Sequence, residues 1–202
     1  MSIYGEYEDT LIQVKDLMEE KLQAYQRLVQ FQTGENAYEH LLARIKTDES
    51  MREKCRRKGI PETAESALGT LTDAVGVRVI CSFVDDIYNI VEYIRSFEDC
   101  DIIEEKDYVK RAKPNGYRSY HMILGVHTKD KDVLGRQPGI YYVEFQIRTI
   151  AMDTWAALEH RMKYKKDIPN QEILVAELKR VADELASCDL SMQTIRELIT
   201  NV

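Results

Sequence analysis

Apolar residues recur at steps of three and four along several stretches of the chain, which places them on one face of an α-helix. The first stretch carries this pattern from Leu11 to Leu28 and is followed by a polar break at 32–36. The second is bounded by Gly59 and Pro61, which are typical of helix ends. The periodicity predicts helices over residues 7–31, 37–58, 85–97, 150–165 and 171–199.

Other segments are rich in β-branched and aromatic residues, with turn residues between them. They predict strands over 74–83, 101–105, 117–128 and 140–148. The order of elements indicates an α+β fold, in which a mixed sheet carries packed helices and long helices stand at both ends of the chain. We expect an N-terminal helix within 1–36, a central domain over 37–165 and a C-terminal helix within 166–202.

The strand predicted over 140–148 has an unusual polar face. Because side chains alternate along a strand, Glu144 and Gln146 share a face with Tyr142 and Arg148, opposite an apolar face. Such a face is often simply exposed to solvent. Asp73 stands at the entrance of another predicted strand, and two carboxylates from separate strands commonly hold Mg²⁺. Asp73 as a turn or helix cap is the alternative.

Cations gather in the segment predicted as the second helix. A run of this kind is usually a solvated face, but a polyphosphate also needs several cations. Its lysines and arginines are Arg44, Lys46, Arg52, Lys54, Arg56, Arg57 and Lys58.

A second candidate lies in the turn that carries Lys113, Tyr117 and His121. A tyrosine just past a glycine turn, with cations on both sides, is suited to stacking on a purine. The same residues would suit a hairpin with a packing tyrosine. Trp155 follows on the next predicted helix, where a tryptophan is more often part of the core than a ligand contact.

The composition favours a globular cytoplasmic protein over secreted, membrane and nucleic-acid-binding classes. The 202 residues are 44% apolar and 31% charged, as in a globular protein. The net charge of −7 argues against a stable nucleic-acid partner. Four widely spaced cysteines favour a reducing cytoplasm over a disulfide framework or a zinc site. The polar, acidic start is unlike a signal peptide, and no apolar run reaches membrane-spanning length, so no membrane partner is expected.

Four motifs, taken in order, resemble the synthetase domain of the RelA/SpoT family. They are Asp73-x-x-Gly76-x-Arg78, Asn115-Gly116-Tyr117-Arg118-Ser119-Tyr120-His121, Glu144-x-Gln146-Ile147-Arg148-Thr149 and Trp155-Ala156-x-x-Glu159-His160. The resemblance spans about 37–164, and the length of the chain is similar to that of the stand-alone small alarmone synthetases. It implies a nucleotidyltransferase-like sheet and transfer of pyrophosphate from ATP to the 3′-hydroxyl of GDP or GTP, with GMP as a third candidate acceptor.

The resemblance also implies roles for individual residues. Asp73 and Glu144 correspond to the catalytic carboxylates that bind Mg²⁺, and Glu144 to the group that activates the 3′-hydroxyl. The residues that correspond to ATP contacts are Arg44, Lys46, Ser50, Lys54, Arg57 and Arg78. Those that correspond to contacts of the GDP or GTP acceptor are Lys113, Tyr117, His121, Gln146 and Glu159. The chain has no His-Asp pair of the kind that marks the hydrolase domain of bifunctional relatives, so we expect synthesis only.

The last predicted helix carries an apolar seam at alternating steps of four and three. The seam could pack on the first helix of the same chain, or it could be covered by another subunit. Since small alarmone synthetases commonly assemble through these flanking helices, we expect a homotetramer. The seam consists of Leu174, Leu178, Val181, Leu185, Cys188, Met192, Ile195 and Ile199.

Two rival functions are alternatives, and the active-site motifs of the first would look nearly the same. One is a toxin-like relative that pyrophosphorylates the 3′ end of tRNA, which would need a basic approach surface that the charge of −7 disfavours. The other is an inactive module that binds RNA or a protein partner, which the presence of both Asp73 and Glu144 disfavours.

Overall fold

The computed structural model describes residues 2–163 and 171–200. After a short 3₁₀ turn at Gly5–Tyr7, the chain forms the helices α1 (Glu8–Thr33), α2 (Asp48–Lys58), α3 (Val84–Arg95), α4 (Ile150–Lys163) and α5 (Gln171–Thr200). A short π-helical segment, Ser66–Thr70, precedes the first central strand. None of the helices in the described parts of the chain combines the length and apolar character needed to cross a bilayer.

A five-stranded sheet forms the centre of the part of the chain that the structure describes. Its strands are β1 (His40–Ile45), β2 (Val75–Cys81), β3 (Cys100–Asp107), β4 (Tyr120–Thr128) and β5 (Gly139–Thr149). Their order is β1-β2-β5-β4-β3, in which only β2 and β5 run parallel. The α+β fold with a mixed sheet that the sequence predicts is therefore confirmed.

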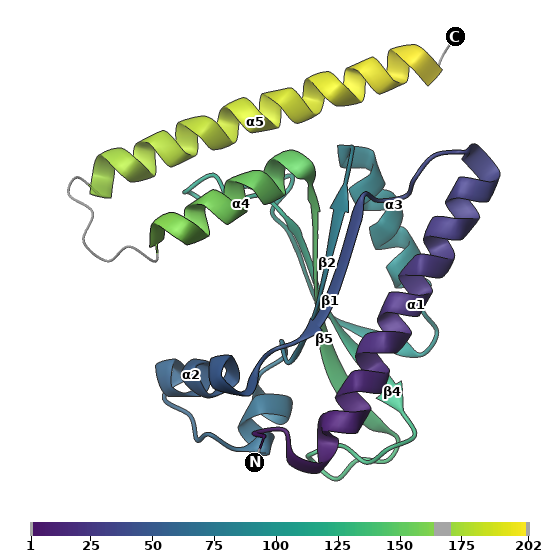
Figure 1. The fold of residues 1–202 in the computed structure, drawn as a ribbon, viewed down its shortest axis with the longest axis vertical. Coiled ribbons are helices and arrows are strands. Elements are labelled where there is room, and N and C mark those ends of the chain that lie inside the picture. Colours follow the sequence, from purple (N-terminus) through teal and green to yellow (C-terminus); the bar gives the residue numbers. More distant parts are fainter. Residues whose placement is uncertain (1, 164–170, 201–202) are drawn as a thin grey trace.

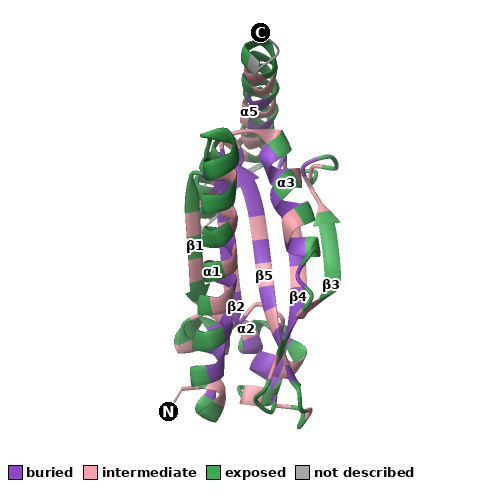
Figure 2. Cartoon of the chain, turned by 90° about the vertical axis from the view of Figure 1, so that its right-hand side faces the viewer, coloured by how far each residue is buried: buried purple, intermediate pink, exposed green. Residues whose placement is uncertain are grey.

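The two faces of the sheet have different neighbours. The helices α1 and α3 cover one face, and α2 and α4 lie on the other side, with α5 crossing over α4 (Figure 1). The apolar stripe of α1, including Leu11, Val14 and Met18, is buried against this sheet, as its periodicity predicts. Along β5 buried residues alternate with half-buried ones, whereas β3 is largely exposed (Figure 2). The half-buried residues include the polar Glu144 and Gln146, whereas Arg148 at the end of the strand is buried.

The prediction of a helix over 37–58 is wrong for the first half of that segment. Residues His40–Ile45 instead form β1, which pairs antiparallel with β2 along its whole length. This segment contains Leu, Ala and Arg, which favour helices, but pairing with a buried strand outweighs that weak local preference. The helix begins only after Thr47, whose side-chain oxygen accepts a hydrogen bond from the backbone N–H of Ser50 at 3.4 Å.

The helix α5 packs mainly on α4 and not, as one alternative had it, along the first helix. Trp155 is 2% exposed and donates its indole N–H to the Leu178 carbonyl at 2.7 Å. Ala182 completes this small apolar cluster. The apolar seam of α5 is thus covered in its first half, whereas Met192 and Ile195 in the second half are exposed. The last two residues of the helix predicted over 150–165, and the boundary placed at 165/166, lie outside the described residues.

Candidate active site

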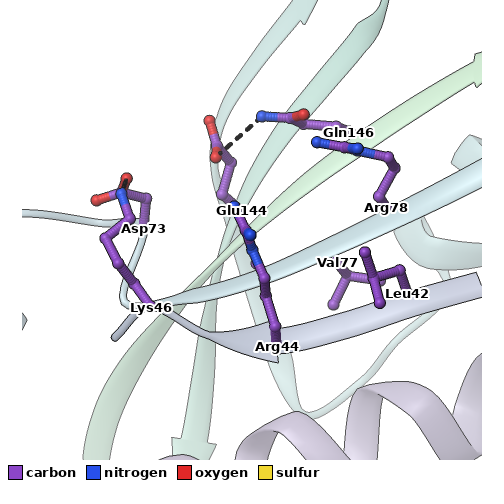
Figure 3. Close-up of a pocket in the computed structure, with 9 residues that line it drawn as sticks. Leu42, Arg44, Lys46, Asp73, Val77, Arg78, Glu144 and Gln146 are labelled. Carbon is purple, nitrogen blue, oxygen red and sulfur yellow. Dashed lines mark hydrogen bonds and ion pairs between the residues drawn. The ribbon is translucent and has the colours of Figure 1, made fainter. Parts of the chain in front are cut away.

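A pocket of about 210 Å³ opens over β1, β2 and β5, on the face of the sheet opposite α1 and α3. Gly76 of β2 stands beside Glu144 of β5, and Arg44 of β1 stands on the other side of Gly76. Because Gly76 has no side chain, and a Cβ there would meet nothing within 4 Å, the space next to Glu144 stays open. Figure 3 shows Asp73 with Lys46 at one end of the pocket, Arg78 beside Gln146 at the other, and Glu144 between them.

Asp73 lies just before β2 and is held by two lysines. Its Oδ2 atom accepts hydrogen bonds from Lys46 and from Lys54, the latter at 2.6 Å. Burial raises the pKa of Asp73, but the hydrogen bonds and charges of the two lysines outweigh it, and the pKa is lowered. Its other oxygen, Oδ1, is buried and has no hydrogen-bond partner among the described residues. An ionised carboxylate with one unpartnered buried oxygen is suited to a cation ligand.

Glu144 lies on β5 and has polar neighbours on both sides. Gln146 donates to its Oε2 at 3.2 Å, and the Nδ1 atom of His121 lies 3.7 Å from its Oε1. Burial raises the pKa of Glu144, but the interaction with His121 outweighs this effect, and the pKa is lowered. Glu144 is therefore ionised at neutral pH and can bind a cation or accept a proton.

The donor set fits Mg²⁺ better than a transition metal. Both Asp73 and Glu144 offer only oxygen ligands, and the described residues contain no cluster of three or more histidine, cysteine, aspartate or glutamate side chains of the kind that holds a metal by itself. Mg²⁺ is usually bound by one or two carboxylates, with substrate phosphates and water completing its octahedral shell. Such an ion would need no protein ligand beyond these two carboxylates.

The cations predicted to contact ATP separate into two groups. Arg44, Lys46 and Arg78 line the pocket, and Lys54 reaches its edge through Asp73. Arg78 Nη1 lies 3.7 Å from Asp153, and burial together with the charge of Arg148 lowers the pKa of Arg78. The remaining two predicted contacts, Ser50 and Arg57, are exposed on α2 and do not line the pocket.

Two of the residues predicted to contact the acceptor, Lys113 and His121, lie at the ring of a third, Tyr117. Lys113 Nζ lies 4.8 Å from the ring centroid, and the His121 ring is 5.7 Å away in an edge-to-face arrangement. The Tyr117 hydroxyl lies 2.7 Å from His121 Nε2. Tyr108, which the sequence did not single out, also faces Lys113 at 4.5 Å. These residues form an aromatic and cationic patch at the end of β4, next to the pocket.

The turn before β4 is held from two sides. Glu159 of α4 accepts a hydrogen bond from the Asn115 side-chain amide at 2.7 Å. Gly116 has a φ of +90°, and a Cβ at this position would stand 2.5 Å from the Ala182 Cβ of α5. Trp155 belongs to the apolar cluster beneath the turn, as its residue type suggested. Glu159, one of the predicted acceptor contacts, thus holds the Asn115 side chain of the turn in this structure.

One buried residue of the site was named in a sequence motif but given no role there. Arg148 lies in the same polar row of β5 as Glu144, but its side chain is only 6% exposed and contacts Gln146 and Tyr117. Asp153 of α4, which pairs with Arg148 at 3.1 Å, was missed as well. The alternation of β5 indicated the face on which Arg148 lies, but not that neighbouring elements would cover it.

Comparisons with known proteins agree with this geometry. Residues 43–169 match the family described as the region found in RelA / SpoT proteins. The chain is 42% identical over 166 residues to GTP pyrophosphokinase YwaC of Bacillus subtilis (strain 168), covering 81% of this chain and 76% of that protein. It is 32% identical over 198 residues to GTP pyrophosphokinase YjbM of the same organism, covering 95% and 89%.

A solved structure extends the comparison to the fold. The small alarmone synthetase 1 from Bacillus subtilis, bound to its product pppGpp, superposes with a TM-score of 0.79 at 31% identity, covering 94% of each chain. The small alarmone synthetase 2 from the same organism gives a TM-score of 0.77 at 37% identity, covering 94% of this chain and 97% of that one. The chain therefore belongs to the RelA/SpoT family and, within it, to the small alarmone synthetases.

Proposed function

We propose that this protein is a GTP pyrophosphokinase that transfers the β,γ-pyrophosphoryl group of ATP to the 3′-hydroxyl of GDP or GTP. The products are AMP and the guanosine alarmone ppGpp or pppGpp. The observation that carries the proposal is the pocket in which Asp73 and Glu144 are ringed by Arg44, Lys46 and Arg78, next to the Tyr117 patch. The similarity to two proteins named GTP pyrophosphokinase supports it.

The cations of the pocket suit the ATP side of the reaction. Arg44 and Arg78 have planar guanidinium groups that can stack on adenine and donate hydrogen bonds to phosphate. Lys46 and Lys54 neutralise Asp73 in this structure and stand where a polyphosphate would come close to it. Because ATP and the acceptor are both polyanions, these charges offset the repulsion between them.

The patch around Tyr117 suits the guanine acceptor. Its ring is half-buried and bordered by the exposed Lys113, whose flexible side chain can move aside for a base and contact a phosphate. The patch adjoins Gln146 and Glu144 through His121. An acceptor stacked on Tyr117 would therefore have its ribose directed toward Glu144.

The reaction forms a bond between the acceptor 3′-oxygen and the β-phosphorus of ATP. The bond from the β-phosphorus to the oxygen that bridges it to the α-phosphorus breaks, and AMP leaves with that oxygen. Glu144 accepts a hydrogen bond from the 3′-hydroxyl and takes its proton as the new bond forms. Asp73 and Glu144 together would hold Mg²⁺, which, when bound, neutralises the phosphate oxygens of the transferred group.

We further propose a homotetramer in the cytoplasm. Its support is the exposed second half of the α5 seam, where Met192, Ile195 and Ile199 are between 50% and 73% exposed. An apolar row of this kind is typically covered by another subunit. The cysteines of the described residues are free, as in a reducing compartment.

The test is direct. The purified chain is incubated with ATP, Mg²⁺ and, separately, GMP, GDP or GTP, and the nucleotides are resolved by ion-exchange chromatography. We expect AMP and a 3′-pyrophosphorylated guanine nucleotide in equal amounts, and neither product when EDTA removes the metal. A parallel incubation with tRNA tests the toxin-like rival. Formation of AMP only with tRNA, or with no acceptor at all, would overturn the proposal.

A further inference from the structure

Arg148 is a buried cation in the centre of the candidate site. Its side chain is 6% exposed, yet all three of its nitrogens have partners. Nη2 donates to the Tyr117 hydroxyl at 2.7 Å and to Gln146 Oε1 at 2.9 Å, Nη1 donates to Asp153 at 3.1 Å, and Nε donates to Ser119 Oγ at 3.3 Å. Because a guanidinium group has only donors, each of these contacts fixes which atom of the partner must accept.

The first consequence concerns Gln146. Its carbonyl oxygen must face Arg148, since the amide NH₂ group could not accept from a guanidinium. The NH₂ group is therefore directed to the other side, where it donates to Glu144 Oε2 at 3.2 Å. Arg148 thus selects the orientation of the Gln146 amide that stabilises the charged form of Glu144.

The second consequence concerns Tyr117 and His121. The Tyr117 hydroxyl accepts from Arg148, which leaves its proton for His121 Nε2 at 2.7 Å. If Nε2 accepts, the proton of the neutral imidazole resides on Nδ1, which lies 3.7 Å from Glu144 Oε1. The opposite tautomer would direct a lone pair of Nδ1 toward a carboxylate oxygen, so both ends of the imidazole favour the same form.

From this geometry we infer that Arg148 is a positioning residue whose guanidinium sets the direction of two hydrogen-bond chains, one through Gln146 and one through Tyr117 and His121, that both end on Glu144. The inference rests on the proposed function, in which Glu144 receives the acceptor proton. The inference adds that the hydroxyl of the acceptor-binding ring, Tyr117, belongs to one of these two hydrogen-bond chains. Tyr117 therefore contributes to the chemical step as well as to binding. Because its hydroxyl accepts a hydrogen bond from Arg148, it must donate its own proton to His121.

The first experiment reads the His121 tautomer in the unliganded protein, so that it does not depend on activity. Protein labelled with ¹⁵N-histidine is examined by NMR at pH 8.5, and His121 is assigned with His121→Gln. We expect the Nε2 signal of an acceptor nitrogen and the Nδ1 signal of a protonated one. In Arg148→Met and in Tyr117→Phe, both signals should move toward the average of two interchanging tautomers.

The second experiment separates positioning from binding. In Arg148→Met we expect kcat to fall on the order of 10- to 100-fold, the range seen when a group that orients an active-site ligand is removed, while KM for ATP stays within about twofold. Arg148→Lys keeps the charge but loses the planar fork, so its kcat should be intermediate. Arg180→Met removes an exposed arginine of α5 and is the matched control, with unchanged kinetics.

The inference about Arg148 can be refuted while the proposed function stands. If the chain makes alarmone but the His121 signals are the same in Tyr117→Phe, Arg148→Met and the unmodified protein, the inference is overturned and the function stands. Tyr117→Phe leaves the buried cation and Asp153 in place, so it gives an answer even if Arg148→Met fails to fold. If a variant loses activity only because it unfolds, its Tm will be lowered while the His121 tautomer stays the same. That result would also overturn the inference about Arg148.

Discussion

Gly116→Ala tests whether α5 supports the acceptor-binding turn. Gly116 has a φ of +90°, where an alanine costs about 1–2 kcal/mol. In addition, the new Cβ would stand 2.5 Å from the Ala182 Cβ, whereas carbon atoms in contact are normally about 3.5–4.0 Å apart. The turn and α5 must therefore separate by about 1 Å or more. Since Tyr117 follows directly, its ring would be displaced with the turn.

The expected result is a loss specific to the acceptor. A misplacement of about 1 Å can reduce the rate on the order of 100-fold, so kcat/KM for GDP should fall about 10- to 100-fold, equivalent to about 1.4–2.8 kcal/mol. Lys46, Asp73 and Arg78 lie on other elements, so KM for ATP should change by less than about twofold. Initial rates are measured with GDP varied at saturating ATP, and then with ATP varied at saturating GDP.

A double variant separates overlap from backbone strain. When Ala182→Gly accompanies Gly116→Ala, the nearest remaining atom is the Lys179 Cα at 3.5 Å, which is ordinary contact. The double variant should recover most of the acceptor kcat/KM, even though a glycine within α5 lowers its stability by about 1 kcal/mol. Ala176→Gly, at an exposed position of α5, is the control for the helix effect. If the double variant were no better than Gly116→Ala alone, the contact with α5 would not be what places the turn.

Three further changes test other parts of the site and the assembly. Glu144→Gln should lower kcat by about 100- to 10,000-fold with a nearly unchanged Tm. Its control is Glu98→Gln, at an exposed loop position, which should have no effect. Near-normal turnover of Glu144→Gln would contradict the role of Glu144. Tyr117→Ala should weaken the acceptor by about 1–3 kcal/mol and ATP much less, whereas Tyr117→Phe should keep most of the acceptor affinity; equal losses for both nucleotides would argue against stacking. Replacing the exposed Met192 and Ile195 by Glu should reduce the mass seen by light scattering with α-helical content retained; an unmodified chain that is already monomeric at all concentrations would refute the proposed tetramer.

Features set by local periodicity could be predicted from the sequence. The apolar stripes of α1 and α3 are buried against the sheet, and the polar row of β5 lies on the opposite face, because the spacing of residues along one element decides both. The strand β1 was missed for the converse reason. Its residues favour a helix locally, and only the neighbouring β2, more than thirty residues later, makes a strand the better structure. Thr47, followed by Asp48 and Glu49, was the available signal that the helix starts later.

The site itself depends on registers that no single segment encodes. Glu144 has open space beside it only because the parallel pairing of β2 and β5 places Gly76 opposite it; a shift by one residue would bring the side chain of Val75 or Val77 into that row. Arg148 shows the same limit more clearly. The alternation of β5 places it on the polar face, where an arginine is usually solvated, but the turn with Tyr117 and the start of α4 with Asp153 cover it. A cation enclosed in this way cannot stay unpaired. Because a guanidinium group only donates, every one of its partners must be an acceptor. The directional network around Glu144 is therefore a property of the packing of three elements, which explains why the motif could be recognised from the sequence while its organisation could not.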